Sequence, residues 1–372
     1  MTTQLLRHDL EHPDGRPFFV YGALNGTLDG QESQTSTAAL HLRLDRATRQ
    51  WIAISPSRNT RPGGTAHTLA CPLCVGGAEM PFAFDAVVFE NRFPAFVANP
   101  PLPPVGSLAA PSIGRCEVVV YTDQHEGSIA TLSPLSVARV IAILRDRTAA
   151  LWAEGHVYVM AFENRGAGVG ATLTHPHGQI YALGHLPPAV QAKLTALAWH
   201  RDQHHGCLGC QLVSEDDASE RIIIENESFV VSVPYAARWP FEVHVRGRRH
   251  GLARLADLSA DEALDLARVV RDVVHRYDGL FDIELPYMMC VQEAPAGVTD
   301  WHLHVEFLPP HRSADRFKVR ASVETALGVF INDTLPERSA ERLAAVSTPR
   351  SNWTGVTVPA VRAATTVEMT QP

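Results

Sequence analysis

Two long stretches of the chain place apolar residues at the three- and four-residue spacing of an amphipathic helix. One follows Leu132-Ser133 in LSPLSVARVIAILRDRTAALWAE, and the other follows Leu258-Ser259 in LSADEALDLARVVRDVVHRY. In each stretch the serine stands directly before the apolar pattern, where it is a favourable N-cap residue. Shorter runs rich in β-branched residues, such as CEVVVYTDQH and FEVHVRGRRH, predict strands before each helix.

These landmarks recur in the same order in the two halves of the chain. A Cys-x-x-Cys pair, a strand ending in Glu-Asn, a strand closed by a histidine, a helix, a further strand and a His-x-His pair follow one another twice. Recurrence of so many features in one order indicates duplication of a single unit rather than chance similarity. The first set is Cys71, Cys74, Asn91, His125, Tyr158, His175 and His177, and the second is Cys207, Cys210, Asn226, His250, Tyr287, His302 and His304.

The predicted fold class is α+β, because each half contains strands, one long helix and strands again. We expect two tandem repeats, each an antiparallel sheet with a long helix, that form one extended sheet. The expected division is an N-terminal arm at residues 1–40, a first, catalytic repeat at 41–203, a second repeat at 204–346 and a disordered tail at 347–372.

Composition narrows the class of function. The net charge of -8 provides no field that would gather nucleic acid or anionic lipid. No apolar run approaches the roughly 20 residues of a membrane helix, and the first residues lack the apolar core of a signal peptide. We therefore expect a cytoplasmic protein without nucleic-acid or membrane partners.

Two sets of cysteines and histidines have the composition of a metal site. Zinc is commonly held by four sulfur or nitrogen ligands, two of them from a Cys-x-x-Cys turn. A lone Cys-x-x-Cys could equally be a redox pair or two core residues, but its repetition with histidines favours zinc. His204 and His205 could compete as ligands near the second pair. The predicted sites are Cys71, Cys74, His125 and His175, and Cys207, Cys210, His250 and His302, both structural.

The segment AFENRGAGVGATLTHPHGQIYA predicts a reactive histidine. In an extended strand His175 and His177 project to the same side, and Pro176 restrains His175 to extended conformations. A metal held by His175 would thus fix the backbone that presents His177, whose imidazole is a good nucleophile near neutral pH. Gln179, one step further along the same face, could donate to a phosphoryl oxygen in the transition state.

HPHGQ together with the upstream cysteine pairs resembles the galactose-1-phosphate uridylyltransferase family of the histidine triad superfamily, over about residues 40 to 345. The resemblance implies UMP transfer from UDP-glucose to galactose 1-phosphate or a similar hexose 1-phosphate, through a uridylyl group on His177. It also implies a homodimer in which one subunit contributes to the sugar site of the other. The substrate-binding residues that it implies are Arg58, Arg61, Asn91, Asn164, Gly170, Thr172 and Gln179, with Lys318 and Glu324 at the sugar.

Two departures from the family pattern concern the second repeat. Many members of the family have an additional metal site made of one glutamate and three histidines. The matching positions here are Lys193, Gln292, His304 and Glu306, so that site is not intact. The second Cys/His set instead resembles that of relatives with one zinc site in each repeat, which include the ADP-glucose phosphorylases. Gly178 favours the uridylyltransferase branch, because the phosphorylases tend to carry serine at this position.

Three other interpretations compete with this prediction. The nucleophile could be His304, although Glu306 replaces the glutamine and no glycine-rich loop precedes it. The enzyme could be an ADP-glucose phosphorylase-like or other nucleoside-diphosphate-sugar phosphorylase, with phosphate as the acceptor. Finally, the chain could be a non-catalytic, zinc-stabilised nucleotide-binding protein.

Overall fold

The computed structural model describes residues 4–28, 39–60, 71–106 and 108–365. Its strands are β1 Gln4–Glu11, β2 Pro17–Tyr21, β3 His41–Asp45, β4 Gln50–Ile54, β5 Ala86–Glu90, β6 Ala109–Ala110, β7 Gly114–Val120, β8 Tyr158–Arg165, β9 His177–Leu183, β10 Ile222–Glu225, β11 Phe229–Ser232, β12 Val243–Gly247, β13 Tyr287–Gln292, β14 His304–Leu308, β15 His311–Ser313, β16 Arg316–Phe317 and β17 Ala360–Ala363. The helices are α1 Pro134–Ala153, α2 Pro188–His204, α3 Leu208–Asp217, α4 Ala260–Phe281, α5 Ser322–Leu327 and α6 Pro336–Ala344, with 3-10 helices η1 Pro56–Thr60, η2 Ala167–Val169 and η3 Leu255–Asp257.

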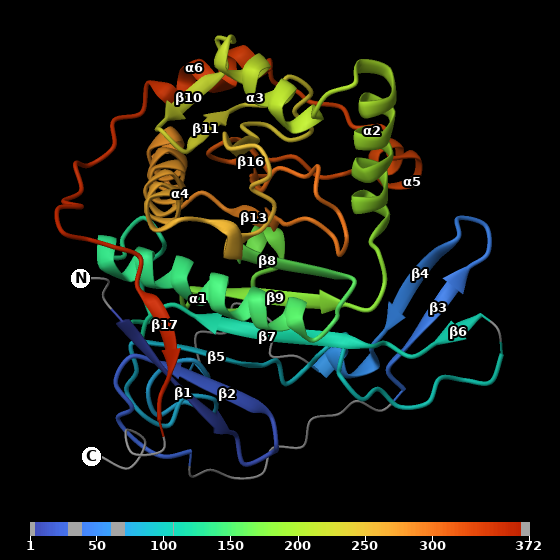
Figure 1. Cartoon of the computed structure of the whole chain (residues 1–372), viewed down its shortest axis with the longest axis vertical. Coiled ribbons are helices and arrows are strands. Elements are labelled where there is room, and N and C mark those ends of the chain that lie inside the picture. Colours follow the sequence, from blue (N-terminus) through green and yellow to red (C-terminus); the bar gives the residue numbers. More distant parts are fainter. Residues whose placement is uncertain (1–3, 29–38, 61–70, 107, 366–372) are drawn as a thin grey trace.

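Twelve strands form one sheet in the order β10-β11-β12-β14-β13-β8-β9-β7-β5-β2-β1-β17 (Figure 1). All pairs except β1 with β17 are antiparallel. The two repeats meet where β8 pairs with β13, with Arg165 opposite Tyr287. The predicted α+β class, with two repeats in one extended sheet, is confirmed.

The two long helices begin where the sequence predicts. Ser133 accepts a hydrogen bond from the backbone N–H of Ser136, and Pro134 occupies the first turn of α1, where its missing N–H costs nothing. Ser259 and Glu262 form a reciprocal capping box at α4. Both helices therefore start directly after a Leu-Ser pair.

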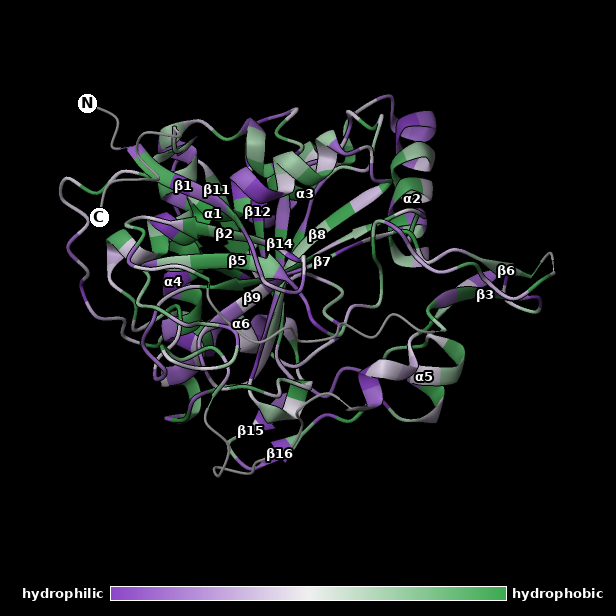
Figure 2. Ribbon diagram, turned by 90° about the horizontal axis from the view of Figure 1, so that it is seen from below, coloured by the Kyte–Doolittle hydropathy of each residue, from purple (hydrophilic) through white to green (hydrophobic). Residues whose placement is uncertain are grey.

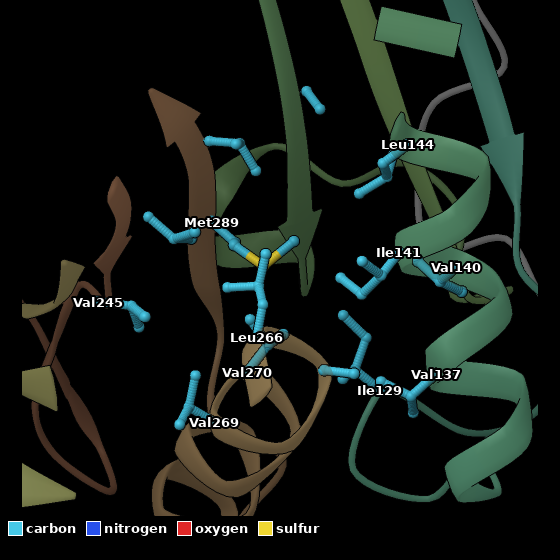
Figure 3. Packing of buried hydrophobic residues seen from close by; sticks show 14 of the residues in the cluster. Ile129, Val137, Val140, Ile141, Leu144, Val245, Leu266, Val269, Val270 and Met289 are labelled. Atoms are coloured by element: carbon cyan, nitrogen blue, oxygen red, sulfur yellow. The ribbon is translucent and has the colours of Figure 1, made fainter. Parts of the chain in front are cut away.

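α1 and α4 pack against the same hydrophobic core on one face of the sheet (Figures 1 and 3). Ile141 and Leu144 of α1, Leu266 and Val270 of α4 and Met289 of β13 are all buried in it. In Figure 2 strands β2 and β5 are largely hydrophobic, whereas β3 and β6, in a small separate sheet with β4, project away from the main sheet. The apolar stripes of both helices thus join the repeats through one core.

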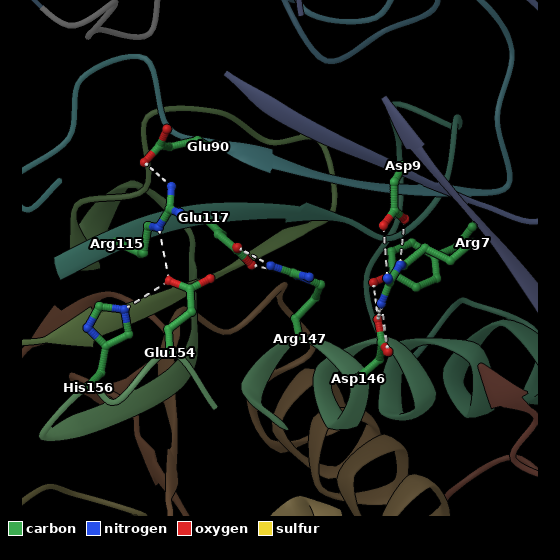
Figure 4. Close-up of polar contacts among 10 residues, drawn as sticks. Arg7, Asp9, Glu90, Arg115, Glu117, Asp146, Arg147, Glu154 and His156 are labelled. Atoms are coloured by element: carbon green, nitrogen blue, oxygen red, sulfur yellow. Dashed lines mark hydrogen bonds and ion pairs between the residues drawn. The ribbon is translucent and has the colours of Figure 1, made fainter. Parts of the chain in front are cut away.

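Ion pairs attach α1 to the strands beneath it (Figure 4). Arg147 of α1 holds Glu117 of β7 at 2.6 Å, with both side chains buried. Arg7 of β1 holds Asp146 of α1 at 2.9 Å. Because a buried charge without its partner is costly, these pairs fix the position of α1 over β7 and β1.

The structure differs from the expected arm and disordered tail. Residues 4–21 form β1 and β2 of the main sheet, and Phe18, Val20 and Tyr21 are fully buried there. The C-terminal segment buries Val358 and adds β17 in parallel beside β1. The continuous apolar run FFVY is a local strand signal, whereas β17 depends on its long-range pairing with β1.

The structure also corrects the proposed equivalence of two pairs of strands. The sequence pattern matched β5, which ends before Asn91, with β10, which ends before Asn226. In the sheet, however, β5 pairs with β7, and the strand in the same position beside β12 is β11. The counterpart of β5 is therefore β11. Gln179 and Glu306 occupy equivalent positions, two residues after the second histidine of each His-x-His pair.

Phe162 lies opposite Gln179 and Cys290 lies opposite Glu306, so Phe162 and Cys290 are counterparts. Counting back three residues from each makes Val159, and not Tyr158, the counterpart of Tyr287. A shift of one residue exchanges the two faces of the strand.

Within the described residues, no helix combines the length and the apolar composition needed to cross a membrane.

Candidate active site

β9 presents one polar and one buried face. His177, Gln179 and Tyr181 are partly exposed, whereas Gly178, Ile180 and Ala182 between them are buried against the helix-covered core. β7 and β8 pair with β9 on its two sides, with Val120 directly opposite His177. A strand held on both edges gives these side chains a fixed direction.

The imidazole of His177 is held in one tautomer. Its Nδ1 lies 2.7 Å from the backbone carbonyl oxygen of His175. A carbonyl oxygen can only accept, so Nδ1 carries the hydrogen and donates it. Nε2 therefore carries the lone pair, which is the atom that a nucleophilic imidazole uses.

A cavity opens over the polar face of β9 and contains four of the predicted site residues, Asn91, Thr172, His177 and Gln179. Its walls are otherwise mostly apolar, as in typical sites for small ligands. The full lining is Pro72, Leu73, Glu79, Phe89, Asn91, Arg92, Phe93, Val118, Thr172, Leu173, His177 and Gln179. Glu79 and Arg92 are polar lining residues that the sequence analysis missed.

Two other predicted residues lie close to this group. Arg58 donates from Nη1 to the carbonyl oxygen of Phe93 at 3.1 Å and to the Tyr181 hydroxyl at 3.2 Å, which places it at the far end of the polar face. Continuing the register of β8 and β9 places Asn164 opposite His177. Arg61 lies outside the described residues.

The glycine-rich loop after β8 contacts the second repeat. Gly170 ends η2 in the left-handed conformation, with φ 82°. A Cβ on Gly168 would lie 2.3 Å from the exposed ring of Phe317, so a larger residue there would displace that ring. Lys318 and Glu324 are not among the cavity-lining residues; both are buried and pair with one another at 2.7 Å.

The first Cys/His set is brought together beside His177. The ligand atoms of Cys71, Cys74, His125 and His175 all lie within 4.8 Å of one another. Cys74 Sγ is 3.3 Å from His125 Nδ1 and 3.7 Å from His175 Nδ1. A tetrahedral metal with ordinary bond lengths separates sulfur and nitrogen ligands by about 3.6 Å, so this set could hold one metal ion.

Hydrogen bonds to the other ring nitrogens fix both histidines of this set. His175 Nε2 donates to the carbonyl oxygen of Thr122 at 2.8 Å, which leaves the Nδ1 lone pair for a metal. His125 Nε2 lies 3.1 Å from the hydroxyl of Thr174.

The second set, Cys207, Cys210, His250 and His302, is also gathered within 4.8 Å. Cys210 Sγ is 3.5 Å from both His250 Nδ1 and His302 Nε2. His302 donates from Nδ1 to the carbonyl oxygen of Gly247, so it presents the opposite ring nitrogen from His175. Across the described chain all six cysteines are free of disulfides.

Two family models match nearly the whole chain. The N-terminal domain of galactose-1-phosphate uridyl transferase matches residues 30–187, and the C-terminal domain matches residues 196–355. The chain belongs to this uridylyltransferase family. A galactose-1-phosphate uridylyltransferase of Thermotoga maritima is 39% identical over 314 residues, covering 82% of this chain and 98% of the relative. One from Streptomyces lividans is 39% identical over 317 residues, covering 79% of this chain and 84% of the relative.

Solved structures agree with this assignment. A uridylyltransferase structure superposes with a TM-score of 0.75 and 31% identity, covering 82% of this chain and 97% of that chain. An ADP-glucose phosphorylase from Arabidopsis thaliana with bound ADP-glucose superposes with a TM-score of 0.64 at 23% identity, covering 83% of this chain and 99% of that chain. The latter likeness shows a shared fold.

In this uridylyltransferase family member, His304 is the counterpart of His177 in the second repeat, and it belongs to an ion-pair network. Nε2 of His304 accepts from Lys193 Nζ at 2.9 Å, and the same ammonium holds Glu306 at 2.6 Å. Gln292 donates to the other oxygen of Glu306 at 3.0 Å. Burial lowers the pKa of His304 to about 4, and Lys193 contributes. The lone pair of His304 is therefore directed at a cation.

A buried polar group supports β9 from the helix-covered side. A Cβ on Gly178 would lie 2.3 Å from the Tyr121 hydroxyl, which explains the need for glycine between His177 and Gln179. The Tyr287 hydroxyl donates to Glu163 at 2.8 Å. Burial raises the pKa of Glu163 to about 7, even though bonds from Tyr287 and Tyr121 favour the ionised form.

This raised pKa predicts a pH effect on stability. Between pH 4.5 and about 7 the unfolded carboxyl group loses its proton while folded Glu163 keeps it, so folding weakens as pH rises through this window. Glu163→Gln removes the effect and still accepts from Tyr287. The free energy of unfolding of the variant minus that of the wild type should rise by on the order of 3 kcal/mol across the window. Urea titrations at several pH values measure it; parallel stability profiles would refute the assignment.

Proposed function

We propose that the chain is a UDP-glucose–hexose-1-phosphate uridylyltransferase, which moves UMP from UDP-glucose to galactose 1-phosphate or a similar hexose 1-phosphate. The observation that carries the proposal is the hydrogen bond from His177 Nδ1 to the His175 carbonyl oxygen, since it leaves a nucleophilic Nε2 on a cavity-lining residue. The names of the curated relatives support the substrates.

The reaction has two displacement steps at one phosphorus. Nε2 of His177 attacks the α-phosphorus of UDP-glucose, and the bond to the departing phosphate oxygen breaks, releasing glucose 1-phosphate. The uridylylated imidazole ring is then a cation that keeps its hydrogen on Nδ1 and still donates it to the His175 carbonyl oxygen. Gln179 donates to a non-bridging oxygen during both steps. A phosphate oxygen of galactose 1-phosphate attacks next, the nitrogen–phosphorus bond breaks, and UDP-galactose leaves.

We propose that both Cys/His sets hold zinc. Two thiolates and two imidazoles complete a tetrahedral zinc and leave no position for water, so both metals are structural. The first zinc would tie together the loop of Cys74, the end of β7 near His125 and the residue before His177. Free thiols in both sets fit a reducing compartment, and a cytoplasmic location is part of the proposal.

We further propose a homodimer. In it, the second repeat of one subunit, residues 204–346, contributes residues to the active site in the first repeat of its partner, residues 41–203. Lys318 and Glu324 are the proposed sugar contacts from the partner subunit. The segment 317–335 around them exposes apolar side chains that an isolated subunit would leave in water. These are Phe317, Val319, Val323, Leu327, Val329, Ile331 and Leu335.

The nucleophile is tested by a matched pair of variants, His177→Gly and His304→Gly. We expect the first to slow the exchange of label between UDP-glucose and glucose 1-phosphate by roughly three orders of magnitude or more. The second should retain exchange, because Lys193 already engages His304. Exchange by His177→Gly at the wild-type rate would contradict the proposal. Offering labelled UDP-glucose with galactose 1-phosphate, inorganic phosphate or water then separates a transferase from a phosphorylase or hydrolase.

The metals are tested by elemental analysis of purified protein. We expect two zinc ions per wild-type chain and one in Cys74→Ser. Cys116→Ser is the matched control and should keep both, because burial raises the pKa of Cys116 to about 11 and keeps that thiol protonated. Folded, active protein without zinc, or an equal loss in both variants, would refute the assignment.

A further inference from the structure

Lys193 of α2 lies at the face of β14 that corresponds to the polar face of β9. Its Nζ is 2.9 Å from His304 Nε2 and 2.6 Å from Glu306 Oε1. We propose that this ammonium takes the place of a metal ion in the second repeat. It supplies the cation that His304 and Glu306 share, and it fastens α2, which leads from the first repeat into the second, to β14. The proposal does not depend on uridylyl transfer.

The two acceptors converge on one point. His304 Nε2 and Glu306 Oε1 are 3.6 Å apart, and an ammonium has donors only, so both atoms accept from Lys193. His304 donates its ring hydrogen from Nδ1 to the carbonyl oxygen of His302 at 2.8 Å, which leaves the lone pair on Nε2. A tetrahedral metal about 2.1 Å from each of two ligands separates them by about 3.4 Å. The ammonium therefore stands where a metal would bind this pair of atoms.

The rest of the cluster does not fit a metal. The Tyr158 hydroxyl donates to Gln292 Oε1 at 2.9 Å, and Gln292 Nε2 donates to Glu306 Oε2 at 3.0 Å. The amide thus turns its NH2 group, which cannot bind a metal, toward Glu306. Among the described residues, only the two Cys/His sets bring three or more such ligand atoms close enough for one ion. The additional metal site that the family resemblance implies is therefore not formed here.

Lys193 is the cation that balances Glu306. The nearby Arg246 is engaged with Asp216 at 3.0 Å. Within the described part of the chain, the ion-pair partners of Glu306 are Lys193 and His304, and the Nε2 atom of His304 already accepts from the ammonium. The Glu306 side chain is only 16% exposed, so its charge would be costly without a partner.

The choice of lysine indicates that the cluster needs a compact charge. The 32 basic residues include only two lysines, Lys193 and Lys318, and each pairs with a glutamate within 2.7 Å. Trp301 limits the space, because its ring stacks on His304 and its centroid lies 5.8 Å from Lys193 Nζ. An ammonium can direct its donors to two separate acceptors there, whereas a guanidinium presents a wider and planar fork.

The ion pair attaches a helix that buries little of its own surface. Within α2 only Val190 and His200 are buried, and Leu194 and Leu197 are partly buried against a small cluster that contains Trp301. Figure 1 shows α2 standing apart from α1 and α4. The pair between Lys193 and Glu306 thus adds a polar anchor between the connecting helix and the sheet of the second repeat.

The coupling is tested by thermal unfolding of full-length Lys193→Met, Glu306→Gln and the double variant. Lys193→Met should lower the unfolding midpoint by about 5 °C or more, because it leaves the Glu306 carboxylate without a cation. The double variant should regain at least half of that loss, since neither charge remains. Arg338→Met is the matched control. It breaks an exposed pair with Glu341 that is also 2.6 Å long, and should shift the midpoint by less than about 1 °C.

The replacement of a metal is tested by titrating the same variants with zinc. Lys193→Met should bind one more zinc than the double variant, which has the same surface histidines, and this zinc should raise its midpoint. The wild type should bind no more zinc than the double variant. An additional zinc in the wild type would make a metal the cation of the cluster and overturn the proposal. A Lys193→Met variant that is as stable as Arg338→Met, that gains nothing from Glu306→Gln or that takes no additional zinc would also overturn it.

Discussion

The hydrogen bond between His177 Nδ1 and the His175 carbonyl oxygen is the constraint on which the site depends. The same His175 turns its ring Nδ1 toward Cys71 and Cys74, and its Nε2 donates to Thr122. One residue thus links the first Cys/His set, the segment after β7 and the tautomer of the proposed nucleophile. Preorganisation of this kind lowers the cost of reaching the reactive geometry, because neither the ring nor its proton has to be rearranged.

The duplicated sheet contains this arrangement twice, but the surroundings of the two histidines differ, and this difference supports His177 as the proposed nucleophile. β9 and β14 each begin at the second histidine of a His-x-His pair, and each such histidine donates from Nδ1 to the carbonyl two residues before it. The difference arises from neighbouring elements. Lys193 of α2 engages His304 and Glu306, whereas His177 lines an open cavity with Gln179.

The sequence predicted those features that are encoded locally or by repetition. The N-caps Ser133 and Ser259, the two Cys/His sets and the polar face of β9 follow from spacing alone. The order of strands in the sheet could not be predicted from the sequence. VVFEN and IIIEN have the same strand pattern, and only long-range pairing distinguishes β5 from β10. The strands at residues 4–21 and 360–363 depend on the same distant pairing. Glu79 and Arg92 carry no local signal, since an isolated glutamate or arginine is usually solvated.

The most direct measurement is the mass of the intact protein after incubation with UDP-glucose alone, followed by peptide mapping. The account predicts one added uridylyl group, located on His177 and removed by galactose 1-phosphate. Transfer to galactose 1-phosphate without any such adduct, or an adduct on His304, would contradict it.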